Sequence, residues 1–251
     1  MELKILGSSS AGNCYVFDNG KEALVVECGI PFQEVKKAVD FDISRIVGCL
    51  VSHEHGDHAK NVQKFLDARI RLFASIGTIQ KMGIIEKIIT AAFYPIALKA
   101  REKQVVGNFT ILPFDVQHDA AEPFGFLIQH YEMGTVLFAT DTYYLPYRFN
   151  GLNNILIECN YRLDLLEANI EAGRVHAITR DRTIQSHMSF DTCKEALLAN
   201  DLSAVNNIVL IHLSDSNSNA LEFQQGIREA TGKTVFVADR GMKLNFNKTP
   251  F

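Results

Sequence analysis

The most constraining feature of this sequence is residues 50–58, which read Leu-Val-Ser-His-Glu-His-Gly-Asp-His. His53 and His55 are two positions apart, so in an extended or turning backbone both imidazoles leave the chain on the same side and can bind one metal ion. Asp57 and His58 follow directly and face a second position, which indicates a pair of neighbouring metal ions. A polar loop at a strand end would not need imidazole and carboxylate at this spacing, which is how first-row metals are held.

The composition is that of an ordinary globular protein with ample material for a core. At 251 residues and 47% hydrophobic, the chain is long enough for one large domain, and we expect residues 1–251 to form one. No apolar run approaches 18 residues and the N-terminus starts with a strand-like pattern, so we expect no signal peptide, no membrane partner and a cytoplasmic location. The five cysteines are scattered, which favours reduced core residues over disulfides.

Strand-like and helical patterns alternate along the whole chain. Strands are predicted at residues 3–6, 14–18, 22–27, 46–51, 71–74, 104–106, 109–114, 124–131, 135–140, 154–158, 207–211, 234–238 and 242–246. Helices are predicted at about 31–39, 59–68, 162–172, 191–200 and 219–230, helical spacing covers 76–89, and a polar loop is predicted over 174–190. With no linker between these segments, the pattern predicts one α/β domain with two packed sheets and helices outside.

Three distant residues can complete a metal site. His118, Asp141 and His212 each follow an apolar strand, as His53 does, whereas His130 and His176 lack such a setting and are interpreted as surface residues. The simplest assembly places His53, His55 and His118 on one metal, and Asp141 as a bridge to a second metal that is held by Asp57, His58 and His212. All these ligands offer nitrogen or oxygen, so two divalent ions per chain are predicted, with zinc, manganese and iron all compatible.

Motifs along nearly the whole chain resemble one family. The chain is similar, in order, to the YycJ/WalJ-like branch of the metallo-β-lactamase fold, which is related to RNase Z and PhnP, at Gly-Ser-Ser-Ser-Ala-Gly-Asn 7–13, His53–His58, His118-Asp-Ala-Ala-Glu-Pro-Phe-Gly-Phe, Ala-Thr-Asp141-Thr, Leu-Ile-Glu158-Cys-Asn, Ser-His187-Met-Ser and Ile-His212-Leu-Ser. The resemblance implies a four-layer αββα sandwich, two mixed sheets flanked by helices, with a dimetal site along one edge.

The resemblance also implies roles outside the metal ligands. In related phosphodiesterases a histidine held by a glutamate contacts the phosphate and can protonate the leaving oxygen, and His187 and Glu158 match those positions. A carboxylate fixes the tautomer of an imidazole and raises its pKa, so the pair suits a general acid. Together with Asp57 they are the predicted catalytic residues. The alternative interpretations are a strand-end charge for Glu158 and a helix-capping neighbour for His187.

Two further features concern substrate binding and the support of the metals. Arg180 and Arg182, near Arg174, are candidates for a phosphate patch beside His187, although a solvated loop is an equal alternative because acidic residues are interspersed. The family has an aspartate at the end of the third strand where this chain has Glu27, one methylene longer. Glu27 is therefore expected to support the ligands from behind, with shifted geometry.

The leading functional hypothesis is a dinuclear metal-dependent phosphodiesterase. We expect a DNA exonuclease that uses a metal-bridging hydroxide, with DNA preferred to RNA as the partner. The net charge of −4 gives no overall signal for nucleic acid, so a small phosphodiester such as a cyclic nucleotide or nucleotide ester remains an alternative. A thioester or lactam hydrolase of the same fold is disfavoured, as is a binding protein that has lost catalysis. Oligomeric state is not predicted.

Overall fold

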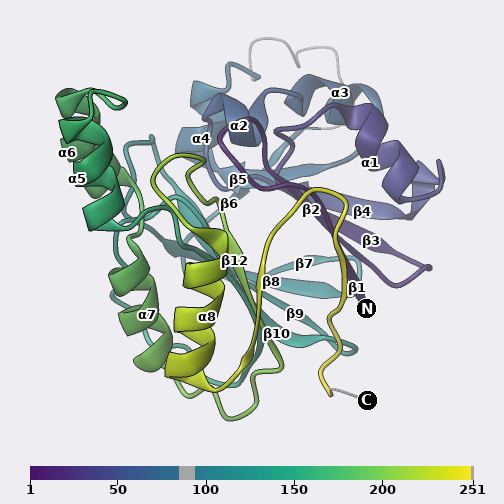
Figure 1. The fold of residues 1–251 in the computed structure, drawn as a ribbon. Helices are drawn as coiled ribbons and strands as arrows, with labels where there is room; N and C mark the ends of the chain where they lie inside the picture. The colour runs from purple at the N-terminus through teal and green to yellow at the C-terminus, as the bar shows by residue number, and fades with distance from the viewer. Residues whose placement is uncertain (85–93, 250–251) are drawn as a thin grey trace.

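The computed structural model describes residues 1–84 and 94–249, which form two seven-stranded sheets packed face to face (Figure 1). The first sheet has the strand order β14-β1-β2-β3-β4-β5-β6. Its strands are β1 (Glu2–Gly7), β2 (Cys14–Asp18), β3 (Ala23–Val26), β4 (Ile46–Leu50), β5 (Leu72–Ser75), β6 (Ile96–Leu98) and β14 (Lys243–Asn245). The second has the order β13-β12-β11-β10-β9-β8-β7. Its strands are β7 (Gln104–Val106), β8 (Phe109–Asp115), β9 (Phe124–His130), β10 (Gly134–Ala139), β11 (Leu152–Glu158), β12 (Asn207–Ile211) and β13 (Thr234–Val237).

Helices cover the outer face of each sheet, as Figure 1 shows. Buried residues of α1 (Phe32–Ala38), α3 (Val62–Asp67) and α4 (Ile76–Lys81) share a core with the first sheet. The short helix α2 (Gly56–Ala59) begins within residues 53–58, which we call the histidine loop. Buried residues of α5 (Leu163–Glu171), α7 (Phe190–Leu198) and α8 (Ala220–Thr231) share a core with the second sheet, and α6 (Ala177–Ser186) lies beside α5. The predicted αββα architecture is confirmed.

The third core lies between the two sheets. It is rich in aromatic side chains, among them Tyr15, Phe17, Phe126, Phe138 and Phe246, all fully buried. Tyr15 of the first sheet packs edge-on against Phe138 of the second, with ring centroids 5.3 Å apart. The strands β2, β3 and β11 are buried at every position because both of their faces are covered, and such strands are mainly apolar.

Each sheet is parallel on one side and antiparallel on the other. In the first sheet β3, β4, β5 and β6 pair in parallel. In the second sheet the parallel pairs join β10, β11, β12 and β13. The residues that leave the carboxyl ends of neighbouring parallel strands therefore emerge together at one edge of the sandwich.

Several local predictions hold and several are wrong. The hairpin over Asp18–Lys21 is confirmed, because β2 and β3 pair in antiparallel fashion around it. The helix predicted at 59–68 is instead the two short helices α2 and α3, and of the helical spacing at 76–89 only α4 is seen, since residues 85–89 lie outside the described residues. The predicted loop at 174–190 contains helix α6, which is largely exposed and so lacks the apolar periodicity that marks a buried face.

His130 is another wrong prediction. It is 4% exposed rather than on the surface, its Nε2 lies 3.2 Å from Glu22 Oε1, and its ring packs 4.7 Å from the ring of Phe109. His176 is exposed, as predicted. All five cysteines are free and buried, as predicted. Every helix in residues 1–84 and 94–249 is too short or too polar to cross a bilayer.

Candidate metal centre

The seven candidate ligands meet because their strands end at the same edge of the two sheets. The loop that carries His53 to His58 follows β4. Asp141 and His212 follow the parallel strands β10 and β12. His118 follows β8, which runs in the same direction as β10 because two antiparallel pairings separate them. A rigid sheet therefore delivers each side chain, although these residues are up to 159 positions apart in the sequence, from His53 to His212.

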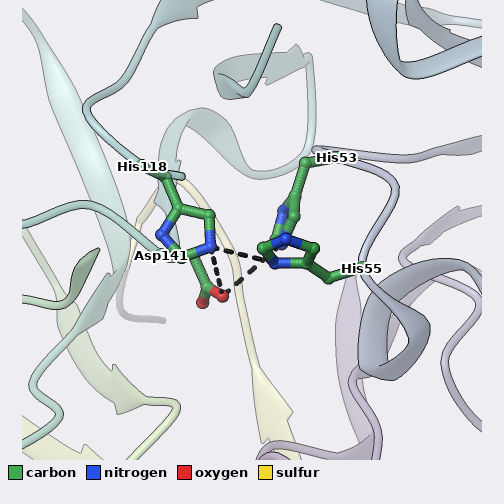
Figure 2. Close-up of side chains that lie close together, drawn as sticks. All are labelled: His53, His55, His118 and Asp141. Carbon is green, nitrogen blue, oxygen red and sulfur yellow. Dashed lines mark hydrogen bonds and ion pairs between the residues drawn. The ribbon is translucent and has the colours of Figure 1, made fainter. Parts of the chain in front are cut away.

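The first group contains His53, His55, His118 and Asp141, whose side chains point toward one another (Figure 2). His118 Nε2 lies 3.1 Å from His55 Nδ1 and 3.5 Å from Asp141 Oδ2. His53 Nε2 lies 3.6 Å from the same carboxylate oxygen. Three imidazoles and one carboxylate thus face one point from three separate segments.

The second group contains Asp57, His58, Asp141 and His212. Asp57 Oδ2 lies 3.2 Å from Nε2 of both His58 and His212. Asp141 belongs to this group as well, since its Oδ2 lies 3.3 Å from His58 Nε2 and its Oδ1 lies 3.2 Å from His212 Nδ1. Within each group one atom per residue lies within 4.8 Å of the others. The carboxylate of Asp141 therefore belongs to both groups and stands between them.

The buried donor atoms fit a cation. His53 Nδ1 lies 2.9 Å from Ser52 Oγ, which leaves Nε2 aimed at the group, and within the described residues that buried nitrogen has no hydrogen-bond partner. An unpaired buried polar atom is costly and calls for a missing partner. His118 is oriented in the same way, because its Nδ1 donates to the carbonyl oxygen of Ser186 at 2.7 Å. Fixing one ring nitrogen so that the other can ligate is typical of metal-binding histidines.

The backbone at the ends of three strands is strained. Glu27, Asp141 and His212 have φ angles of 67°, 45° and 55°, in the left-handed region that non-glycine residues rarely adopt. Such a conformation costs about 1–2 kcal/mol per residue. Each of the three residues lies within two positions of the end of a strand at the candidate centre. The surrounding structure therefore holds a strained backbone at the points where these three side chains turn toward the centre.

The loop at residues 7–13 supports the histidine loop from behind. Asn13 donates through its backbone N–H to the carbonyl oxygen of Asp57 at 2.7 Å and through Nδ2 to Asp57 Oδ2 at 3.2 Å. Ser8 Oγ accepts from the backbone N–H of His212 at 3.0 Å. Gly29 is needed here, because a Cβ at that position would overlap the carbonyl oxygen of Asp57. The glycine and serine residues thus allow close packing against the ligands.

Glu27 lies behind the candidate ligands, against Ser52 and His58. Its carboxylate is fully buried, accepts from the backbone N–H of Ser52 at 3.3 Å, and lies 3.5 Å from His58 Nδ1. The longer side chain still reaches the ring of His58.

His187 and Glu158 form a close pair beside the second group. His187 Nδ1 donates to Glu158 Oε1 at 2.7 Å, and the same oxygen lies 3.2 Å from His212 Nδ1. The other carboxylate oxygen accepts from the backbone N–H groups of Thr142 and Met188, at 2.9 Å and 3.1 Å. Glu158 is therefore fixed and holds His187 by Nδ1. The other ring nitrogen, Nε2, has no hydrogen-bond partner among residues 1–84 and 94–249.

The carboxylates strongly perturb the pKa values of the histidines. Burial lowers the pKa of His212, but Asp141, Asp57 and Glu158 outweigh that effect and raise it to about 10. Burial also opposes the charge on His187, yet Glu158 raises the pKa of His187 overall. Burial raises the pKa of Asp57, but hydrogen bonds from His212 and His58 hold it well below its usual range. The second group therefore attracts positive charge, which a divalent cation also supplies. In the first group burial lowers the pKa of His53 and of His118, which favours the neutral imidazoles that ligate metals.

A cavity of about 260 Å³ opens onto both groups and onto His187. Arg182 lines it, whereas Arg180 is absent from its described lining and pairs with Glu167 at 3.0 Å and Asp181 at 3.3 Å. The structure therefore separates the two arginines that the sequence grouped together. Two residues that support the candidate ligands, Asn13 and Ser8, were not predicted to do so, although both lie within the 7–13 motif. They are far from His53 in the sequence, so nothing local indicates this role.

Comparisons with known proteins agree with this geometry. A family model described as the β-lactamase superfamily domain matches residues 24–213. Exodeoxyribonuclease WalJ of Streptococcus pneumoniae serotype 2 is 25% identical to this chain over 236 residues, which cover 86% of this chain and 83% of that protein.

Solved structures are similar over almost the full length. The metallo-β-lactamase fold protein YhfI from Bacillus subtilis aligns with a TM-score of 0.75 at 16% identity, covering 97% of this chain and 98% of YhfI. The Zn²⁺-bound PqqB from Methylobacterium extorquens aligns with a TM-score of 0.74 at 15% identity, covering 98% of this chain and 100% of PqqB. These similarities confirm the metallo-β-lactamase fold expected from the motifs.

Proposed function

The chain belongs to the β-lactamase superfamily, as a hydrolase with the metallo-β-lactamase fold, and we propose that it is a phosphodiesterase that degrades DNA as an exonuclease. The observation that carries the proposal is the His187–Glu158 pair, which faces the same cavity as both candidate ligand groups. Cleavage of a phosphodiester releases a poor leaving group, an alkoxide, which a positioned acid must protonate. The similarity to exodeoxyribonuclease WalJ supports DNA as the substrate.

We assign the two ligand groups to two divalent ions. His53, His55 and His118 would hold one ion. Asp57, His58 and His212 would hold the second, and Asp141 would contact both. Nitrogen and oxygen donors of this kind suit zinc, manganese or iron, and the Zn²⁺ of PqqB supports zinc. When bound, such ions lower the pKa of water and neutralise charge on a phosphoryl group.

The remaining chemistry belongs to the side chains. Glu158 holds His187 by Nδ1, so Nε2 is the atom that would donate a proton to the leaving oxygen. Arg182 would contact a phosphate at the mouth of the cavity. Glu27 would hold His58 in place. Because both sheets contribute candidate ligands and share one core, residues 1–251 would form one domain.

A small phosphodiester is the second candidate substrate. It is favoured by the net charge of −4 and by the modest size of the cavity, about 260 Å³. A nuclease with this charge must bind DNA through a local patch.

The test combines metal content with substrate choice. The purified chain is analysed for zinc, manganese and iron, and then assayed on end-labelled single-stranded and double-stranded DNA, on cyclic nucleotides and on bis-p-nitrophenyl phosphate. We expect two ions per chain and progressive shortening of DNA from an end. Cleavage of the small esters alone would move the assignment to a small-molecule phosphodiesterase. Absence of bound metal after reconstitution would contradict both candidates.

A further inference from the structure

A second hollow lies directly beside the metal centre. It measures about 370 Å³ and is lined by Gln117, His118, Asp119, Tyr143, Arg182, Gln185 and Ser186. It shares His118 and Arg182 with the cavity over the candidate ligands, so the two spaces adjoin. Its size is at the lower end of the range for small-molecule sites. The roles assigned above to metals and to His187 leave this hollow without a function.

The aromatic ring in this hollow is exposed on a fixed backbone. Tyr143 is 41% exposed, yet its N–H donates to the carbonyl oxygen of Gln117 at 3.2 Å. The preceding residue, Thr142, is fully buried and bonds on both sides, accepting from the N–H of Gln117 at 3.0 Å and donating to the carbonyl oxygen of Tyr144 at 2.8 Å. In residues 1–84 and 94–249 no other ring packs against Tyr143. A flat face is thus offered by a segment that starts at Asp141.

The polar side chains around this ring are available for a ligand. The side-chain amides of Gln117 and Gln185 are on the surface, and neither makes a hydrogen bond within the part of the chain that the structure describes. Arg182 is 73% exposed at its side chain and is held only loosely, 3.5 Å from Asp119 Oδ2. Amides can both donate to and accept from the edge of a base, and a guanidinium suits a phosphate.

We propose that this hollow binds a nucleobase next to the phosphate that is cleaved, with Tyr143 as the stacking face. The inference rests on the proposed function, because it places the base beside the metal centre. Stacking on an aromatic ring tolerates any base, and Gln117 and Gln185 can serve donors and acceptors alike, so sequence preference is weak. A stacked base must first leave the duplex, so the site selects a single-stranded end of the nucleic acid.

The test is a cycle that changes the ring and the base in turn. Wild type, Tyr143→Ala and Tyr143→Phe are compared on a single-stranded oligonucleotide and on two versions of it. Each version carries an abasic residue at one of the two nucleotides that flank the terminal phosphodiester. Tyr144→Ala is the matched control, because Tyr144 is the next residue and is also exposed, but it is not among the described residues that line the hollow.

The expected result is a non-additive loss. Wild type should lose about ten- to a hundredfold in kcat/KM when one of the two bases is removed. Tyr143→Ala should lose a similar factor on the intact oligonucleotide and nothing further on the abasic one, whereas Tyr143→Phe and Tyr144→Ala should behave as wild type. Binding of a phosphorothioate oligonucleotide, followed by fluorescence anisotropy in EDTA, should weaken in Tyr143→Ala by a similar factor without any contribution from metal.

The base pocket would be overturned if the loss from Tyr143→Ala and the loss from base removal add up at each of the two flanking nucleotides. It would also be overturned if Tyr143→Ala cleaves the intact oligonucleotide as fast as wild type. Turnover of methyl p-nitrophenyl phosphate, which has no base, checks that Tyr143→Ala leaves the metal centre intact. Wild-type protein that cleaves neither DNA nor this ester contradicts the proposed function itself. Wild-type protein that cleaves DNA while Tyr143→Ala matches it contradicts the pocket alone.

Discussion

Two polar clusters lie at opposite edges of the sheets and use similar residue types in opposite ways. The amino-end cluster, where parallel strands begin, comprises two groups of contacts: Asp18 with Lys4 and Arg45, and Glu22 with Asn108 and His130. The carboxyl-end cluster consists of the seven candidate ligands with Glu27, Glu158 and His187. In the amino-end cluster each carboxylate has its own cations or N–H donors. In the carboxyl-end cluster, the buried His53 Nε2 has no hydrogen-bond partner among the described residues.

Asp18 illustrates a complete set of partners. It accepts from Lys4 Nζ at 2.8 Å, from Arg45 Nη1 at 2.6 Å and from the N–H of Gly20 at 2.8 Å. Glu22 is bonded similarly by Asn108 and His130. The comparison teaches that polar residues in the core are not in themselves a site: a site is indicated where the chain's own atoms leave a polar group incomplete.

The largest expected effect is that of Asp141→Asn. The substitution removes the charge that both ligand groups share, so metal content should fall and turnover should drop below detection, by more than about a hundredfold. Elemental analysis and the DNA assay measure both, and circular dichroism checks the fold. A variant that keeps two ions and full activity would contradict the shared role of Asp141.

His187→Ala should keep both ions and lose about 10²–10⁴-fold in DNA cleavage. The loss should be much smaller on bis-p-nitrophenyl phosphate, since nitrophenolate is a good leaving group that needs no acid. Equal losses on the two substrates would argue against proton donation by Nε2 and for a role in positioning alone.

Removal of metal should lower the free energy of unfolding through the carboxyl-end cluster but not through the amino-end cluster. A chelator should lower the Tm of wild type, since bound ions stabilise the folded state by about 4 kcal/mol at a thousandfold excess over Kd. The amino-end cluster needs no metal, so the destabilisation caused by a substitution there should be the same with and without chelator. Urea unfolding in both conditions measures it, and a strong dependence on chelator would break the comparison.

Asp18→Asn should cost about 3 kcal/mol in the free energy of unfolding, because it removes the closest and most buried counter-ion of Lys4 and Arg45. The other carboxylates near these two cations lie farther away, at 3.6–3.9 Å, and are more exposed. Activity per folded molecule and metal content should stay unchanged. Loss of metal in this variant would mean that the two edges of the sheets are coupled.

The smallest effect concerns pH. Burial raises the pKa of Asp18, but its bonds from Lys4 and Gly20 outweigh this and lower that pKa in the folded state. A lowered folded-state pKa gives stability that is present above the unfolded value and lost as the pH falls through the folded one. The difference in unfolding free energy between wild type and Asp18→Asn should therefore shrink on acidification below about pH 4. A constant difference would contradict the ionised state of Asp18.

The two clusters also differ in how well the sequence predicts them. The ligand loop at 53–58 is contiguous, so its chemistry is visible without a structure, and strand ends pointed to His118, Asp141 and His212. By contrast, His130 was misassigned because its partner Glu22 lies 108 residues away, and nothing local marks the pairing. Periodicity detects a buried face, so it missed α6, which has almost none.

The hollow with Tyr143 was equally invisible in the sequence. An aromatic residue after a strand is most often core, and only the structure shows that this ring is exposed. Arg180 and Arg182 are two positions apart, yet a helix turns them to different neighbours, Glu167 and Asp119. Spacing along the chain cannot predict which of two such residues faces a site unless the element that carries them is known.

The distribution of ligands over both sheets has a consequence for the making of the protein. The second ligand group needs His212, and the first sheet is closed at its edge by β14, the last strand, which pairs with β1. A growing chain on the ribosome therefore holds the histidine loop long before it holds a complete centre. Synthesis itself therefore delays completion of the second ligand group until His212 has been translated, 159 residues after His53.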